Sequence, residues 1–273
     1  MTAVLGLATC FNRRDKTVNA IKVLTEGNPK LSMDFIIVDD NSSDGTAEAL
    51  NRFDNVKVLH GDGNLYYSGG MRMAIAEAKK TDKNYDYCLL FNDDVKFYDH
   101  CIEYLVSKAE QKDAVWVGPT CDENGKLVYS GIIRRSKFAP KYRHLLAETE
   151  AGVECETLNG NCVLIPWHIF MDVDNMPAIY RQYFSDYHYG FDITRKGYKI
   201  MAPDRFIGMC KDDTKKENSW KDTSLSLKER IRKKESVKGL PFKEYFYYLN
   251  HNFNFATAVV YSFSPYVKMF IGK

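Results

Sequence analysis

Short apolar runs alternate with longer amphipathic stretches through residues 1–120 of the chain. Runs with the length and continuity of buried strands lie at residues 3–10, 34–40, 56–61, 85–94 and 114–119. The stretches between them have helical periodicity, at residues 13–27, 42–53, 68–80 and 98–111. Nearly continuous apolar strands separated by helices are typical of a mostly parallel sheet covered on both faces. We therefore expect an α/β fold.

The pattern is less regular after residue 120. Residues 122–131 predict a hairpin, and residues 137–154 are polar enough to predict an irregular loop. Residues 155–170 predict a strand that leads into a short helix. An amphipathic helix ended by Gly197 and followed by a strand is expected over residues 183–200. With this segment the first predicted domain, residues 1–210, ends.

Residues 211–273 are predicted to form a helical C-terminal extension. An exposed loop at 211–223 precedes two expected helices, at 225–239 and at 241–270, with Pro241 in the first turn of the second. The extension holds 13 Lys and Arg against 7 Asp and Glu, a net charge of +6, whereas the rest of the chain carries −4. A basic segment followed by an aromatic helix at 242–253 favours attachment to an anionic membrane surface. The alternative is a solvated charged helix beside one that packs on the core or on a second subunit, as in a homodimer.

Composition narrows the class of protein only slightly. The overall net charge of +2 argues against a dedicated nucleic-acid binder. The N-terminal apolar run has the length of a strand and no basic region before it, so we do not expect a signal peptide. Seven cysteines form no CxxC pair and are expected to be reduced structural thiols.

Polar and glycine residues gather where the first four predicted strands end. Residues 9–13 follow the first strand, Asp39 and Asp40 end the second, and Asn64 with Gly69–Gly70 follows the third. Asp93 and Asp94 end the fourth, where two buried like charges would be costly unless a metal ion, a hydrogen-bonded turn or solvent offsets them. Ligands of parallel sheets bind at this carboxyl edge, so we expect a site there.

Six ordered sequence blocks carry a family resemblance: "LATCFNR", "IIVDDNSSDGT", "GNLYYSGGMRMAI", "LLFNDDV", "LNGNCVLIP" and "FSDYHYGFDITRKGYKI". Together they resemble the family 2 glycosyltransferases, inverting enzymes of the Rossmann-like GT-A fold, over about residues 3–210. The blocks are most similar to bacterial rhamnosyl- and galactofuranosyltransferases that build surface polysaccharides. The resemblance implies a GT-A domain with a mostly parallel sheet and flanking helices, followed by the helical extension.

The resemblance also implies a nucleotide-sugar site. Asp39 would accept a hydrogen bond from the N3–H of uracil or thymine, with Asp40 supporting the site, although a purely structural Asp39 is the alternative. Gly69 and Gly70 would let the backbone approach the nucleotide closely. The other residues expected to bind nucleotide are Thr9, Phe11, Arg13, Asn64, Arg72, Asn92 and Asp93.

The triplet Asn92-Asp93-Asp94 corresponds to the family's DxD motif. By resemblance, Asp94 would bind Mg²⁺ or Mn²⁺ that bridges to the donor diphosphate. Asn92 departs from the strict motif and would contact ribose directly or through water. A histidine that completes the metal shell in many relatives is replaced here by the region of Cys210 and Asp212, which leaves that ligand open.

A carboxylate at the start of a late helix is the catalytic base in this family, and Asp186 occupies that position. It would deprotonate the acceptor hydroxyl as this oxygen attacks the anomeric carbon. His188 is the alternative base and is also placed on the acceptor side. Trp167 would either stack on a sugar or belong to the core. The turn expected to line the acceptor comprises Asn159, Gly160 and Asn161.

The resemblance therefore implies a metal-dependent inverting glycosyltransferase. The donor would be UDP- or dTDP-linked, and the acceptor a glycan or lipid-linked glycan of a capsule or O-antigen pathway. The enzyme would be cytoplasmic and peripheral at the inner face of the membrane. A nucleotidyltransferase is a competing hypothesis, although the glycine-rich phosphate loop expected after its first strand is absent. A catalytically inactive nucleotide- or sugar-binding scaffold is the other competing hypothesis.

Overall fold

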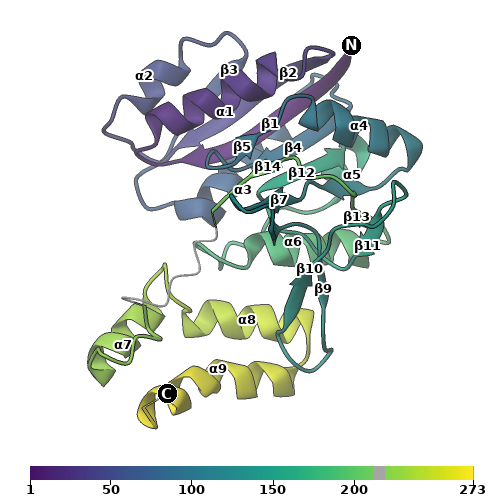
Figure 1. Cartoon of the computed structure of the whole chain (residues 1–273). Coiled ribbons are helices and arrows are strands. Elements are labelled where there is room, and N and C mark those ends of the chain that lie inside the picture. Colours follow the sequence, from purple (N-terminus) through teal and green to yellow (C-terminus); the bar gives the residue numbers. More distant parts are fainter. Residues whose placement is uncertain (212–218, 273) are drawn as a thin grey trace.

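A computed structural model describes residues 1–211 and 219–272 of the chain. Its centre is an eight-stranded sheet in the order β11-β13-β6-β12-β4-β1-β2-β3 (Figure 1). Strands β3, β2, β1 and β4 are parallel, and β6 is parallel to β13, whereas β12 is antiparallel to both of its neighbours. The predicted, mostly parallel α/β sheet is therefore confirmed. The strands are β1 (Thr2–Cys10), β2 (Leu31–Asp39), β3 (Val56–His60), β4 (Tyr87–Phe91), β6 (Val115–Val117), β11 (Val153–Cys155), β12 (Cys162–Pro166) and β13 (Ile200–Ala202).

Helices cover both faces of this sheet because successive residues of each strand point to opposite sides. On β1, Val4 and Ala8 join one buried cluster, while Leu5 and Leu7 join the other. The first cluster is covered by α1 (Arg14–Glu26), α2 (Thr46–Leu50) and α4 (Cys101–Gln111). The second is covered by α3 (Tyr66–Ala78), α5 (Trp167–Asp172) and α6 (Ser185–Arg195).

Two small sheets lie beside the main one. The first has the order β5-β14-β7-β8, formed by β5 (Lys96–Phe97), β14 (Gly208–Met209), β7 (Thr120–Cys121) and β8 (Leu127–Tyr129). Strands β7 and β8 form the hairpin predicted near residues 122–131. The second sheet pairs β9 (Ile132–Arg134) with β10 (Tyr142–His144).

The predicted irregular loop at residues 137–154 is partly wrong. This segment supplies β10 and the first two residues of β11, and it buries Leu145 and Ala147. Each strand here is three residues long, too short for an alternating pattern to be visible in the sequence. Partners distant in the sequence determine this segment's structure.

In the described part of the C-terminal region, residues 219–272, the chain forms three helices: α7 (Leu227–Glu235), α8 (Phe242–Asn252) and α9 (Phe255–Phe270). The prediction of a single helix at 241–270 is wrong, because α8 ends at Asn252 and α9 begins at Phe255. The side chain of Asn254 accepts a hydrogen bond from the Thr257 backbone N–H at 2.9 Å and so caps α9. Much of the loop predicted at 211–223 lies outside the described residues.

A third buried cluster joins the C-terminal helices to the rest of the molecule. It contains Tyr180 and Phe191 from the region of α6, Tyr248 and Leu249 from α8, and Ala258 from α9. In Figure 1, α8 lies next to α6, and α9 lies beyond α8, farthest from the sheet. Within the described part of the chain, no helix is long and apolar enough to cross a bilayer.

Candidate functional site

The two carboxylates after β4 have different surroundings. Asp93 is buried, and its oxygens accept hydrogen bonds from Arg13 Nη1 at 2.6 Å and from Thr17 Oγ1 at 2.8 Å. Burial raises the pKa of Asp93, and the Arg13 guanidinium and the Thr17 hydroxyl oppose that shift. The charge of Asp93 is therefore balanced by the protein itself.

Asp94 is only partly satisfied. Its Oδ2 accepts from Arg13 Nη1 at 3.1 Å, but its buried Oδ1 has no hydrogen-bond partner among the described residues. A buried acceptor without a partner costs about 1–3 kcal/mol, and more when charged. This oxygen is thus the atom at this edge best prepared to meet a cation or a hydrogen-bond donor from a ligand.

No group of three or more His, Cys, Asp or Glu residues able to hold a metal is found within residues 1–211 and 219–272. A cation beside Asp94 would therefore rely on phosphate oxygens and water, which is a usual coordination mode of Mg²⁺. Cys210 lies nearby, with its Sγ 3.9 Å from Asn161 Nδ2. Asp212, the other residue considered for the missing histidine, lies outside the described residues.

The turn at residues 159–161 is hydrogen-bonded to the end of β4 on one side and to the start of α6 on the other. Asn92 Nδ2 donates to Asn161 Oδ1 at 2.6 Å, and the Asn92 N–H donates to the Asn161 carbonyl at 3.1 Å. At the other side of the turn, the Gly160 N–H donates to Asp186 Oδ2 at 3.0 Å. The predicted acceptor turn, the DxD-like triplet and the predicted base are therefore brought together.

Asp186 lies in the first turn of α6. Its carboxylate is only partly exposed and also accepts a hydrogen bond from the Tyr187 N–H at 2.9 Å. Burial raises the pKa of Asp186 from 3.8 to about 6, while the backbone N–H groups of Gly160 and Tyr187 limit that rise. Such a carboxylate is mostly ionised at neutral pH and is still basic enough to take a proton.

Tyr67 is a further candidate for this site that the sequence patterns did not single out. Its buried hydroxyl has no hydrogen-bond partner within the described residues. A Cβ built on Gly160 would lie 2.1 Å from this hydroxyl, so only glycine leaves room for it. Burial, and then the charges of Asp186 and Asp94, raise the pKa of Tyr67 well above its usual value. A tyrosine at the start of an apolar helix is typical of a core residue, so no sequence pattern indicated that the charges of both carboxylates act on this hydroxyl.

The other predicted nucleotide residues follow the ends of β1, β2 and β3. Asp39 is buried and accepts a hydrogen bond from the Ser42 N–H at 3.1 Å. Asp40 accepts from the N–H groups of residues 63, 65 and 66, and thereby shapes the loop before α3. Phe11 and Asn64 are exposed on loops at the same edge.

Thr9 lies beneath the start of α3. Its Oγ1 donates to the Val38 carbonyl at 3.1 Å, and a Cβ on Gly70 would lie 2.1 Å from this Oγ1. The close approach expected of Gly70 is thus made to Thr9 within the protein.

Residues 7–162 match the family model described as glycosyl transferase family 2. The chain belongs to glycosyl transferase family 2. Comparison with curated proteins gave no match.

Solved glycosyltransferase structures confirm the GT-A fold of this family 2 chain. The S. aureus TarS 1–349 complex with UDP-GlcNAc aligns with a TM-score of 0.58 at 14% identity, covering 98% of this chain and 79% of that one. The mannosyltransferase PcManGT from Pyrobaculum calidifontis, in complex with GDP-Man and Mn²⁺, gives 0.55 at 13%, covering 96% and 74%. GalNAc-T7 with UDP, GalNAc and Mn²⁺ gives 0.58 at 12%, covering 92% and 50%.

Two predicted site residues of this glycosyltransferase have structural contacts instead. Arg72 Nη1 donates to the carbonyls of Tyr180 at 2.7 Å and Pro177 at 3.2 Å, so it supports the loop before α6. Trp167 follows β12, which runs antiparallel to β4, so it lies at the sheet edge opposite Asp94. Its ring packs on Tyr85 with centroids 5.2 Å apart, in line with the core alternative.

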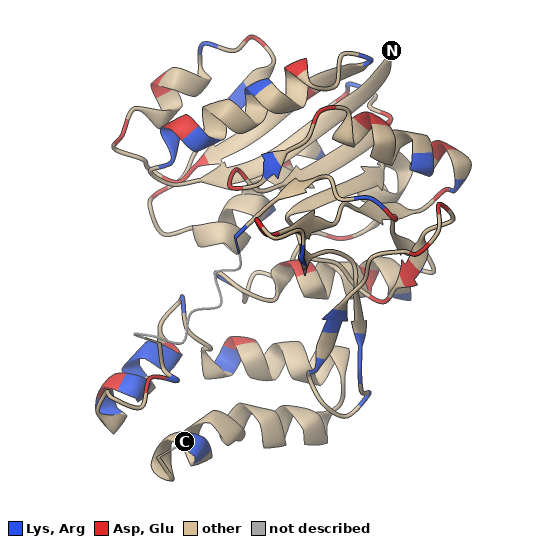
Figure 2. Ribbon diagram, viewed as in Figure 1, with Lys and Arg blue, Asp and Glu red and all other residues tan. Residues whose placement is uncertain are grey.

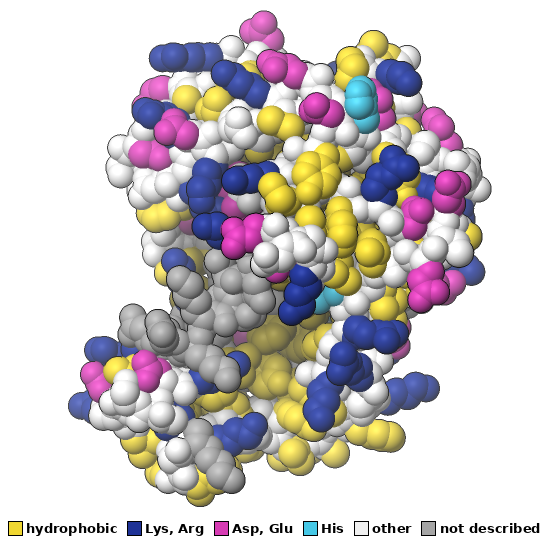
Figure 3. Space-filling view, in the orientation of Figure 1, with side chains coloured by type: hydrophobic (Ala, Val, Ile, Leu, Met, Phe, Trp, Pro, Cys, Tyr) yellow, Lys and Arg dark blue, Asp and Glu magenta, His cyan; other side chains and the backbone are white. Residues whose placement is uncertain are grey.

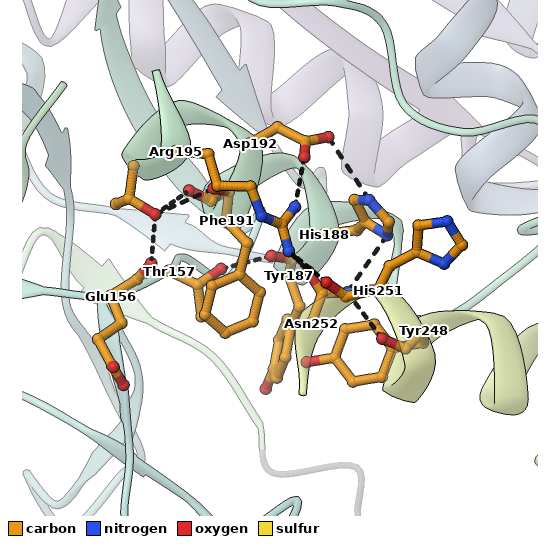
Figure 4. Close-up of polar contacts among 12 residues, drawn as sticks. Glu156, Thr157, Tyr187, His188, Phe191, Asp192, Arg195, Tyr248, His251 and Asn252 are labelled. Carbon is orange, nitrogen blue, oxygen red and sulfur yellow. Dashed lines mark hydrogen bonds and ion pairs between the residues drawn. The ribbon is translucent and has the colours of Figure 1, made fainter. Parts of the chain in front are cut away.

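His188 is the third predicted residue that the structure places away from the site. Two residues after Asp186 on a helix, it points to the opposite side of α6 and is buried against α8 (Figure 4). Its Nδ1 lies 2.7 Å from Tyr180 Oη and 3.3 Å from Asn252 Nδ2. Burial, together with Arg195 and His251, lowers the pKa of His188 from 6.5 to about 4. The interior position disagrees with a role as base or acceptor ligand.

Proposed function

We propose that this glycosyltransferase is a metal-dependent inverting enzyme that uses a UDP- or dTDP-linked sugar. Two carboxylates near the 159–161 turn carry the proposal. Asp94 keeps a buried oxygen without a partner in the described chain, and Asp186, which is bonded to the turn, has a raised pKa. One of these groups suits a cation and the other suits proton abstraction. The transferred sugar is proposed to be a hexose or deoxyhexose, of the rhamnosyl or galactofuranosyl kind.

A divalent cation fits Asp94 Oδ1, because this hard carboxylate oxygen is buried, unpartnered within the described chain and beside the carboxyl edge. Mg²⁺ and Mn²⁺ both accept such ligands, and either would offset the charge that develops on the leaving nucleoside diphosphate. Arg13, held by Asp93 and Asp94, places a second positive charge at the same edge. Two of the similar solved complexes contain Mn²⁺, which supports a divalent metal here.

The acceptor hydroxyl is proposed to lose its proton to Asp186. The Gly160 and Tyr187 N–H groups hold this carboxylate in place and leave its ionised form accessible near neutral pH. A single base that activates the acceptor oxygen is what direct displacement with inversion requires. Asn159, whose Nδ2 lies 3.4 Å from Asp186 Oδ2, is proposed to line the acceptor side.

The acceptor is proposed to be a glycan or lipid-linked glycan of surface polysaccharide synthesis, used at the inner face of the membrane. In this proposal, residues 1–210 are the catalytic domain and residues 211–273 are an extension that serves attachment.

Nucleotide binding and donor hydrolysis test the proposed function. Thermal shifts would be measured with UDP, dTDP and GDP, each with and without Mn²⁺, and donor hydrolysis would be followed by mass spectrometry. We expect one nucleotide to raise the Tm more with metal than without, and Asp94→Asn to remove the metal-dependent part. Asp82→Asn, an exposed carboxylate change on the connection before β4, is the matched control. No stabilisation by any nucleotide under either condition would refute the proposal.

A further inference from the structure

The outer face of α9 is an apolar surface that the described residues leave mostly exposed. It comprises Ala256, Val260, Phe263, Val267 and Phe270, spaced three or four residues apart, and Ile271 directly after the helix. At 100° per residue these positions fall within an arc of roughly 100°. The large side chains are strongly exposed: Val260 61%, Phe263 53%, Val267 57%, Phe270 70% and Ile271 60%. Phe263 is the most covered of them, because its ring also packs on Phe242 of α8 with centroids 5.2 Å apart.

The opposite face of α9 is packed. Ala258, Pro265 and Met269 are buried, and α8 and α7 lie against this side. Lys234 of α7 is fully buried, and its Nζ donates to Tyr266 Oη at 3.0 Å and to the Leu240 carbonyl at 2.8 Å. Because these contacts fix the orientation of α9, its outer face is turned away from α7 and α8.

The tip of the β9–β10 hairpin extends this surface at the start of α9. Phe138 is 76% exposed, and its carbonyl accepts a hydrogen bond from Thr257 Oγ1 at 3.3 Å. Arg135, Lys137 and Lys141 are exposed cations on the same hairpin. Figure 2 shows the hairpin in blue beside α9.

Positive charge also lies at the other end of α9. Lys228 and Arg232 of α7 are exposed, and Lys268 lies on α9 itself. Figure 2 shows α7 with more blue than red, and Figure 3 shows yellow, dark blue and some magenta side chains on this end of the molecule. Residues 245–273 contain no Asp or Glu at all. Exposed cations of the hairpin and of α7 thus flank the apolar face, and the carboxylates at this end, Glu229 and Glu235, lie on α7 and not on α9.

We propose that the outer face of α9, together with Phe138, docks on the surface of an anionic lipid bilayer. A helix whose exposed side is apolar and whose flanks are cationic suits the boundary between acyl chains and negative headgroups. A second copy of the chain fits less well, because pairing two outer faces would bring the same cations of both copies together. The proposed function includes membrane attachment through residues 211–273, and this inference assigns that attachment to a defined surface. It rests on the proposed function only in that a lipid-linked acceptor would be reached at the membrane.

This assignment differs from the one that the sequence favoured. The aromatic helix expected to face lipid, residues 242–253, is α8, and its side chains are occupied within the protein. Tyr248 is fully buried, and Phe184 stacks on Tyr248 and Tyr245 with centroids 4.7 and 5.4 Å apart. The aromatic content of α8 serves packing on α6, whereas α9 carries the uncovered apolar face.

Vesicle co-sedimentation of the full chain tests the proposal. The vesicles would be phosphatidylcholine alone or with phosphatidylglycerol, without nucleotide sugar. We expect binding only to the anionic vesicles, and at least roughly tenfold weaker binding for the double variant V260S/F263S. Met171→Ser, an exposed apolar change on α5, is the control that should bind like the parent chain. Lys137→Glu should weaken binding by roughly fivefold or more, whereas Lys22→Glu on α1 should not.

Three outcomes would overturn the proposal: no binding to anionic vesicles, equal binding to both vesicle types, or unchanged binding by V260S/F263S. A dimer in light scattering that V260S/F263S dissociates, without vesicle binding, would assign the face to a second copy instead. Circular dichroism checks that each variant is folded. Donor hydrolysis without vesicles is scored separately, so failure of docking and failure of the transferase function are distinguishable.

Discussion

The two sides of helix α6 place an ionisable group in opposite settings. Asp186 lies on the side that faces the carboxyl edge of the sheet, and His188 lies on the side packed against α8. Burial favours the neutral form of both, which raises the pKa of Asp186 to about 6 and lowers the pKa of His188 to about 4. A shifted pKa therefore does not by itself identify a catalytic group.

Their partners distinguish the two residues. His188 is enclosed by Tyr180, Asn252 and Asp192, and its ring stacks on Tyr247. Asp186 accepts hydrogen bonds from the backbone N–H groups of Gly160 and Tyr187. Tyr67, on which the charges of Asp186 and Asp94 both act, and Asp94 itself each keep a polar atom without a partner in the described chain. The side of α6 that leaves polar atoms unsatisfied is the side prepared for a ligand.

The largest expected effect is that of Asp186→Asn. An amide cannot take the acceptor proton, so kcat should fall by about 10²–10⁴-fold. Folding should not suffer, because the substitution removes a carboxylate whose ionised form burial disfavours. Steady-state kinetics and urea unfolding measure the two quantities.

A matched control is available on the same helix. Asp192→Asn changes a carboxylate six residues later, which pairs with Arg195 at 2.6 Å on the packed side. Its kcat per folded molecule should stay within about threefold of the parent value. Normal turnover by Asp186→Asn with intact nucleotide binding would remove Asp186 as the base.

His188→Leu should lower stability and leave turnover almost unchanged, the reverse of what is expected for Asp186→Asn. Leucine fills the volume but leaves the hydroxyl of Tyr180 and the amide of Asn252 with fewer partners, so unfolding free energy should drop by about 2–3 kcal/mol. Turnover measured well below the Tm should change little. A large loss of kcat in a variant that is still folded would return His188 to the catalytic site.

The sheet could be predicted because it depends on local patterns, whereas Asp186 was proposed from the family resemblance of its sequence block. Continuous apolar runs marked β1, β2 and β4, and a polar residue at each strand end marked the edge. Trp167 could not be placed, since whether β12 runs parallel or antiparallel to β4 decides which edge it reaches. Neither could His188, because the helix that covers it, α8, is more than fifty residues away in the chain.

The same comparison predicts opposite pH effects. kcat/KM should be constant above pH 7 and fall about tenfold per unit below about pH 6, as Asp186 takes up a proton. For stability, the raised pKa of Asp186 means that the folded state gains up to about 2 kcal/mol from this group as pH falls from 7 to 4.

His188 opposes that gain, because its lowered pKa contributes stability above pH 6.5 that is lost as pH falls toward 4. As pH is lowered, the free energy of unfolding should therefore fall more steeply in Asp186→Asn than in the parent chain, and less steeply in His188→Leu. Equal slopes in all three proteins would contradict the assigned shifts.

The smallest effect should come from Tyr67→Phe. This change removes only a buried hydroxyl that has no partner within the described residues, so folding should be unaffected or more stable by about 1 kcal/mol. The hydroxyl lies against Gly160, close enough to Asp186 and Asp94 to sense both charges. If it donates to the bound substrates, kcat/KM should fall by about tenfold while stability is kept. Tyr189→Phe is the control, since that hydroxyl is also buried and unpartnered in the described chain but belongs to the core. Loss of activity in the first variant and not in the second would place Tyr67 in the site with Asp186, whereas equal behaviour would assign both hydroxyls to packing.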